Sequence, residues 1–155
     1  MIELEVNNDE RIAKQLGKAI QGLTNRSPLM QKLAGTMLSV VQQNFVESGR
    51  PKWAGLAYRE GKPLIDSGNL QNSIQAKHNH DEAIVGTNVL YAALHHFGGT
   101  IKPKKVNYLK FKIGERFVQV KSVTIPARPF LTLTEQDKAD LVADMQDYFR
   151  SLLSQ

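Results

Sequence analysis

An apolar repeat with the period of an α-helix runs through residues 27–49, and a helix of this length should form the backbone of the core. Pro28 suits the first turn of such a helix, where its missing N–H costs no hydrogen bond, and Ser27 is expected to be the N-cap. Gly49 and then Pro51 end the pattern, so the helix should have about 20 residues and be the longest in the chain. Its buried face is predicted to consist of Leu29, Leu33, Met37, Val40, Val41 and Phe45.

Two further helical patterns lie towards the ends of the chain. In the first, Asn8 or Asp9 is expected to cap a helix that Gly17 weakens, so that this helix needs partners to stay ordered. Its apolar stripe consists of Ile12, Leu16, Ile20 and Leu23. In the second, Thr134 and Asp137 have the spacing of a capping box. Its stripe consists of Leu141, Val142, Met145, Phe149, Leu152 and Leu153.

Short alternating segments predict strands. The N-terminal IELEV is expected to be one strand, and SIQAKH and EAIVGT are expected to be two more, joined by a polar turn at residues 79–81. The plainest β-hairpin joins VNYLKFKI to RFVQVKSV through Gly114 and Glu115, and glycine at the first turn position favours type II′. One face of this hairpin should carry Tyr108, Lys110 and Lys112. The other face should carry Leu109, Phe111, Ile113, Val118 and Val120.

Three segments have less regular patterns. Residues 50–68 show no sustained period and predict a long loop. Trp53 in this loop either reaches a neighbouring surface or folds back onto its own core, the commoner position of a single Trp. Residues 88–97 predict a short helix that ends at Gly98. Its inward residues are expected to be Leu90, Ala93, Leu94 and Phe97. In IPARPFL, residues 125–131, two prolines hold the backbone extended and prevent it from pairing as a central strand.

Together these elements predict an α+β fold, with a small antiparallel β-sheet and a β-hairpin packed against a long α-helix, and with further N- and C-terminal helices. The length of 155 residues fits one domain, residues 1–155. The chain has no cysteine, which excludes disulfide scaffolds, thiol nucleophiles and Cys-ligated zinc. No apolar run approaches the roughly 20 residues that span a bilayer, so no membrane partner is expected.

Positive charge is concentrated in one part of the chain. Residues 1–100 are nearly neutral, with ten Lys and Arg against nine Asp and Glu. Residues 101–130 contain eight Lys and Arg against one Glu, an excess of seven, whereas residues 131–155 contain two basic and five acidic residues. The basic segment either faces phosphates or an acidic partner, or is a solvated strand face whose lysines protect an edge.

The histidines do not indicate catalysis. His78 and His80 would point to the same side of a strand, as metal ligands do, but they fall at a predicted turn with no third histidine nearby in sequence. His95 and His96 are neighbours on a predicted helix, so their side chains diverge by about 100°. One of them should pack beside the core and the other should face solvent or a partner. Neither a nucleophile elbow nor a phosphate-binding glycine loop is present. We therefore expect no enzyme activity, no cofactor and no metal.

Several segments carry a family resemblance when they are taken in order. They are Trp53 with Leu56, LIDSGNL (64–70) with Ser73-Ile74, VGT (85–87), YAALHHFGG (91–99) and IPARPFL (125–131). In this order and at these spacings the chain resembles the virion morphogenesis proteins of tailed bacteriophages, above all those of Mu-like phages and the related tail-completion proteins. The resemblance covers Trp53 to Leu131, with a compatible helix on each side. His96 departs from it, because family members usually have Gln at this position.

The resemblance implies a structural, non-enzymatic protein at the head–tail junction or the upper end of the tail. Such proteins act as homo-oligomers, commonly six-fold rings, beside other head–tail connector or tail proteins, in the virion or in the host cytoplasm during assembly. The residues expected to bind a neighbouring subunit or to line a DNA path are Trp53, Tyr91, His95, Lys110, Lys112 and Arg128. The guanidinium of Arg128 suits a carboxylate or carbonyl, in a partner or within the chain.

Three other hypotheses stay open. A ring around a DNA path would let the lysine face of the hairpin make non-specific contact with translocating DNA. A stand-alone nucleic-acid-binding module would need aromatics among the lysines on an exposed face, where Tyr108 is the expected one. A hydrolase acting on the cell wall is the third, with His95 and Asp66 as the residues to test.

Overall fold

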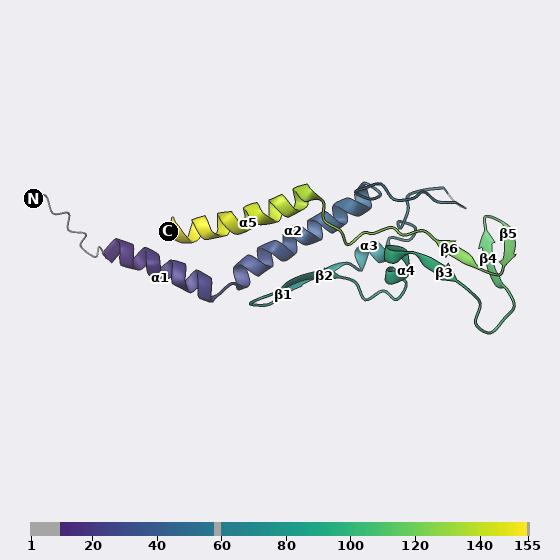
Figure 1. Cartoon of the computed structure of the whole chain (residues 1–155), viewed down its shortest axis with the longest axis horizontal. Coiled ribbons are helices and arrows are strands. Elements are labelled where there is room, and N and C mark those ends of the chain that lie inside the picture. The colour runs from purple at the N-terminus through teal and green to yellow at the C-terminus, as the bar shows by residue number, and fades with distance from the viewer. Residues whose placement is uncertain (1–9, 58–59, 155) are drawn as a thin grey trace, which may run out of the picture.

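The computed structural model describes residues 10–57 and 60–154, and it has an elongated shape with long helices towards one end and a β-hairpin at the other (Figure 1). The helical end contains α1 (Glu10–Thr24), the first half of α2 (Ser27–Val46) and α5 (Glu135–Leu153). The predicted N-terminal strand, the proposed caps Asn8 and Asp9, and Tyr58 lie outside the described residues.

The long helix α2 has nearly the predicted bounds, but Ser27 is not its N-cap. Arg26 holds the N-cap position with helical backbone angles (φ −86°, ψ −1°) and makes no side-chain cap bond. Asn25 instead accepts a hydrogen bond from the Ser27 N–H through Oδ1, at 3.2 Å. At the other end Gly49 has φ +98°, and a Cβ there would lie 2.4 Å from the Trp53 ring, so the stop requires glycine.

The buried face of α2 also differs in part from the prediction. Of the six predicted residues, Leu33 and Met37 are half-buried and the others are buried. Ala34 and Asn44 are buried as well. Thr134 caps α5 as predicted, because its hydroxyl accepts from the Asp137 N–H while the Asp137 carboxylate accepts from the Thr134 N–H.

In the described residues the strands form three separate antiparallel pairs, and the α+β class is confirmed. Both predicted hairpins are present: β1 (Gln75–His78) with β2 (Ala83–Gly86), and β4 (Leu109–Ile113) with β5 (Arg116–Val120). The β1–β2 hairpin packs against α2, whereas β4–β5 lies at the far end from the helices (Figure 1). The third pair, β3 (Gly99–Ile101) with β6 (Val123–Ile125), was not predicted, since each strand is only three residues long.

The core lies where the C-terminal half of α2 meets α3 (Asn69–Asn72), α4 (Ala92–Phe97) and the IPARPFL segment. Phe45 is fully buried at its centre, with ring centroids 5.6 Å from Trp53 and 5.5 Å from Phe130. The remaining buried members of this cluster are Val41, Leu70, Ile74 and Ala92. Trp53 therefore folds back onto its own core.

The predicted helix at residues 88–97 is shorter than expected. It begins at Ala92, because Thr87 Oγ1 accepts from the Val89 N–H and holds the preceding residues in a turn. As a result Leu90 is 99% exposed, and the prediction that Leu90, Ala93 and Phe97 point inward is wrong, whereas Ala92 is buried. Gly98 ends the helix as predicted, with φ +72°, but its ψ of 175° is extended because β3 starts at the next residue, beside β6.

Within the described residues, no helix has the length and apolarity that crossing a bilayer requires.

Candidate assembly surfaces

The IPARPFL segment is fixed to the loop that follows α2 by two buried side chains. The Arg128 side chain donates from Nε to the Ala54 carbonyl (2.8 Å) and from Nη2 to the Gly55 carbonyl (2.7 Å), and the residue is 5% exposed. Trp53 donates from its indole N–H to the Pro129 carbonyl at 3.0 Å. Arg128 thus binds carbonyls within the chain. Trp53 and Arg128 are buried in the single chain, so they hold the IPARPFL segment in place and do not themselves form an exposed surface. Their part in a subunit contact stays a prediction.

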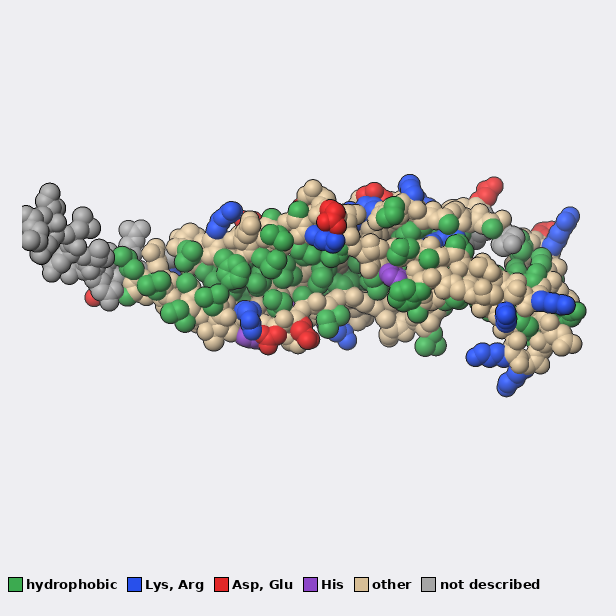
Figure 2. Space-filling model, in the orientation of Figure 1, with side chains coloured by type: hydrophobic (Ala, Val, Ile, Leu, Met, Phe, Trp, Pro, Cys, Tyr) green, Lys and Arg blue, Asp and Glu red, His purple; other side chains and the backbone are tan. Residues whose placement is uncertain are grey.

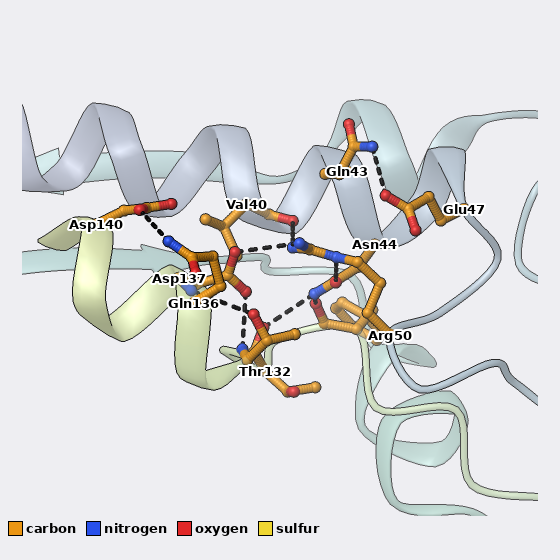
Figure 3. Close-up of polar contacts among 11 residues, drawn as sticks. Val40, Gln43, Asn44, Glu47, Arg50, Thr132, Gln136, Asp137 and Asp140 are labelled. Carbon is orange, nitrogen blue, oxygen red and sulfur yellow. Dashed lines mark hydrogen bonds and ion pairs between the residues drawn. The ribbon is translucent and has the colours of Figure 1, made fainter.

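A buried polar network holds α5 to α2 (Figure 3). Asn44 is fully buried, and its amide donates to the carbonyls of Phe130 (2.9 Å) and Thr132 (3.0 Å). Arg50 donates to the Asn44 side chain (2.9 Å) and to the Asp137 carboxylate (3.1 Å). Sequence reasoning missed this network, although Asn44 lies seven residues after Met37 on the apolar face of the helix, where a polar residue signals a buried hydrogen bond.

The Asp137 carboxylate is charged in this network. Burial raises its pKa, but the hydrogen bonds from Thr134 and Arg50, with the positive charge of Arg50, outweigh burial, and the pKa lies below its ordinary value. The carboxylate therefore satisfies both the α5 cap and the guanidinium of Arg50 at neutral pH.

An open, mostly apolar cleft of about 930 Å³ lies between this core and the β4–β5 hairpin. Tyr91 and His95 line its core side, and the apolar face of the hairpin lines the other, with Leu109, Phe111 and Ile113. Tyr91 is 43% exposed, and its hydroxyl accepts from Asn69 at 2.9 Å. Five of the six predicted site residues line this cleft; besides Tyr91 and His95 they are Lys110, Lys112 and Arg128, and Trp53 does not line it.

The two neighbouring histidines are both half-buried, so neither is fully exposed to solvent, and a contact of one of them with a partner stays a prediction. Burial, and secondarily the charge of Arg128, lower the pKa of His95, so its ring is neutral at pH 7. Its Nδ1 atom is buried without a hydrogen-bond partner among the described residues. Burial also lowers the pKa of His96, whose Nδ1 accepts from the Phe130 N–H at 3.3 Å. His96, the departure from the family pattern, therefore supports the IPARPFL backbone.

His80 at the β1–β2 turn joins two parts of the fold. His80 contacts the Thr24 carbonyl and the Asp81 carboxylate, and Asp81 pairs with Arg26 at the corner between α1 and α2. The hydrogen bond to Asp81, followed by that to Thr24, raises the pKa of His80. In the described part of the chain, no three His, Asp or Glu side chains converge as a metal site requires.

The helical end presents a broad apolar face (Figure 2). Contact between α1 and α5 is close at Gly22, where a Cβ would lie 2.4 Å from the Leu152 side chain. The predicted stripes extend beyond this contact and stay open, with Ile20 63% exposed and Leu153 60% exposed. The other large apolar side chains exposed on α1 and α5 are Ile12, Leu16, Leu23, Val142 and Phe149.

The β4–β5 hairpin has the predicted two faces. Its two-residue turn has positive φ at Gly114 and not at Glu115, as type II′ requires. Lys110 and Lys112 are exposed, and Phe117, opposite Lys112 in the ladder, is 80% exposed on the same side. The expectation that Tyr108 is the one aromatic among these lysines is therefore wrong. The strict alternation with Val118 and Val120 already placed Phe117 there.

Comparison with known proteins assigns the chain to a family. The model of the phage virion morphogenesis family matches residues 7–150. The Mu-like prophage FluMu G protein 2 of Haemophilus influenzae is 48% identical over 153 residues, which cover 99% of each chain. No solved structure matches the chain. The match over most of its length and the near-complete alignment with this relative show that the chain belongs to the phage virion morphogenesis family.

Proposed function

We propose that this morphogenesis protein acts in tail completion or head–tail joining, as a subunit of an oligomeric ring, and that its role is structural rather than catalytic. The observation that carries the proposal is the apolar face of α1 and α5, which the chain leaves open. The protein would work in the host cytoplasm during assembly or in the virion, beside connector or tail proteins.

The total accessible surface area is larger than that of a compact monomer, which supports a chain whose apolar surfaces are covered by neighbouring subunits. Its accessible area is 11,432 Å², whereas a compact monomer of this mass would expose about 7,800 Å². If the 12 residues outside the described part were all fully extended, they would account for at most about 1,900 Å² of the difference. The described residues therefore expose well over 1,000 Å² more than a compact monomer does, by the same scaling.

The helical face has the size of a subunit contact. The seven large apolar side chains on α1 and α5 are between 40% and 63% exposed. Together they leave open about 600 Å², since a fully exposed side chain of this size presents about 150–200 Å². Monomers rarely expose apolar patches beyond a few hundred Å², and each partner in a standard interface buries about 800 Å².

Two unlike apolar surfaces on one chain favour a ring over a two-fold dimer. The helical face lies at one end of the molecule, and the cleft beside Tyr91 and His95 lies towards the other. If the helical face of one subunit contacts a different surface of the next, the contact is heterologous, and such contacts close into rings when the rotation allows. The six-fold count rests on the family resemblance.

Electron microscopy of particles made without this protein tests the role in joining. We expect separate heads and tails, which the wild-type gene supplied in trans should convert to complete particles. Normal infectious particles in its absence would contradict the proposal.

A further inference from the structure

We propose that the exposed face of the β4–β5 hairpin binds DNA through its phosphate backbone, without sequence preference. This inference does not depend on the role in head–tail joining, because the binding is a property of the isolated chain.

The first support is uncompensated charge. Seven basic residues between positions 102 and 121 are all exposed, and none of the ion pairs found in the described residues involves them. They are Lys102, Lys104, Lys105, Lys110, Lys112, Arg116 and Lys121. In the same interval Glu115 is the one acidic residue. Figure 2 shows Lys and Arg side chains projecting from the end of the molecule opposite the helices. A concentrated positive field of this kind attracts a polyanion.

The second support is the shape of the surface. The hairpin is a two-stranded antiparallel ribbon of five residues per strand, and a ribbon of this width fits the major groove of B-DNA. Its ladder pairs Lys110 with Gln119 and Lys112 with Phe117, so that cationic, amide and aromatic groups share one face. Lys110 and Lys112 border the cleft together with the apolar residues of β4, yet both are exposed to solvent. The lysine face is therefore open to a partner.

The side-chain types suit a nucleic acid that is bound without sequence preference. Six of the seven cations are Lys, which binds phosphate as a point charge and imposes no fixed geometry on the contact. Phe117 lies in solvent at 80% exposure, and its ring can pack against sugars or bases whatever their sequence. Lysines with an interleaved aromatic ring match a nucleic acid better than an acidic protein.

Fluorescence anisotropy with a random-sequence DNA duplex tests the inference on the full chain. The Lys110→Gln/Lys112→Gln variant removes two cations from the face. The Lys14→Gln/Lys77→Gln variant removes two exposed cations from α1 and β1 and is the matched control. We expect the wild type and the control to bind at about 50 mM salt and to lose affinity steeply by about 200 mM. The hairpin variant should bind about tenfold more weakly at low salt, with a salt slope smaller by roughly 1.8.

Phe117→Ala separates stacking from charge, because it should weaken binding without changing the salt slope. Circular dichroism checks that each variant is folded. No binding by the wild type at low salt would overturn the inference, and so would an equal loss in the control variant. Binding to polyglutamate or to anionic lipid vesicles as strong as to DNA would also overturn it. Neither result would bear on the electron-microscopy test of head–tail joining.

Discussion

The centre of the molecule and its helical end use apolar residues in opposite ways. Around Phe45 the large side chains are buried, and the polar side chains of Asn44 and Arg50 beside them are hydrogen-bonded. On α1 the same classes of residue form an equally regular stripe, yet Ile20 and its neighbours on this stripe are about half exposed. The comparison shows that the centre is complete in one chain, whereas the helical end presents half of a core that a neighbour has to complete.

The sharpest contrast should come from truncating one apolar side chain in each region. Phe45→Ala removes a fully buried ring and should lower the free energy of unfolding by about 3–5 kcal/mol. Ile12→Ala, at a side chain 45% exposed, should cost the dilute chain less than about 1 kcal/mol. Urea unfolding at low protein concentration measures both. Equal losses would mean that the helical end is as complete as the centre.

The polar network at the centre should respond to acid. The Asp137 pKa in the folded chain lies below its ordinary value of 3.8, so its contribution to stability is present above that pH and is lost as the pH falls through the folded-state pKa. Asp137→Asn should lower the free energy of unfolding at pH 7 by about 2–3 kcal/mol, because the charge partner of Arg50 is removed. In this variant the free energy of unfolding should change less between pH 7 and pH 3 than it does in the wild type. Asp140→Asn, an exposed position on the same helix, is the control.

Two glycines extend the comparison to the backbone. A Cβ at Gly98 would lie 2.7 Å from the Ala127 nitrogen, and its backbone angles are those that favour glycine, so Gly98→Ala should destabilise the chain by about 1–3 kcal/mol. Gly17 lies within α1 with open space around its Cα, so Gly17→Ala should stabilise the chain by about 0.5–1 kcal/mol. Thermal unfolding measures both changes in stability and shows whether each is a gain or a loss. A loss of stability at Gly17 would reveal a neighbour that the single chain does not have.

The smallest expected effects concern the histidines. His80 at the corner of the helical end should titrate above its ordinary pKa of 6.5, because Asp81 and the Thr24 carbonyl favour its charged form. Its small contribution to stability is present below pH 6.5 and lost as the pH rises through the folded-state pKa. His95 beside the core should titrate below 6.5. NMR titration measures both, and Asp81→Asn should lower the His80 pKa while leaving His95 unchanged.

Local patterns sufficed to predict much of the fold. The helices, the capping box at Thr134 and the hairpin turn at Gly114 each depend on residues close together in sequence. The β3–β6 pairing and the carbonyl partners of Arg128 could not be predicted, because they join segments far apart in sequence. Every residue has a backbone carbonyl, so the sequence does not mark the ones that Arg128 binds. Periodicity alone also failed at Leu90, where a hydrogen bond from the Val89 N–H to the Thr87 side chain delays the helix.

The surfaces were predicted less well than the elements. Alternation placed Lys110 and Lys112 on one face of the ribbon, and the structure agrees. An apolar stripe, by contrast, has the same sequence signature whether it is buried in its own chain or against another. For this reason the sequence alone could not show that the stripe of α1 stays open or that Trp53 turns inward.

The central claim is that the helical face is a contact between subunits, and light scattering after size exclusion tests it most directly. The wild type should elute well above the 17.3 kDa of one chain. Ile20→Glu, which places a charge in the exposed stripe, should shift the protein to monomer while its circular dichroism stays unchanged. Gln21→Glu adds the same charge at an exposed neighbour that points about 100° away from Ile20, outside the apolar stripe, and should keep the wild-type mass. A wild type that stays monomeric at high concentration, or an Ile20→Glu variant with the wild-type mass, would contradict the account.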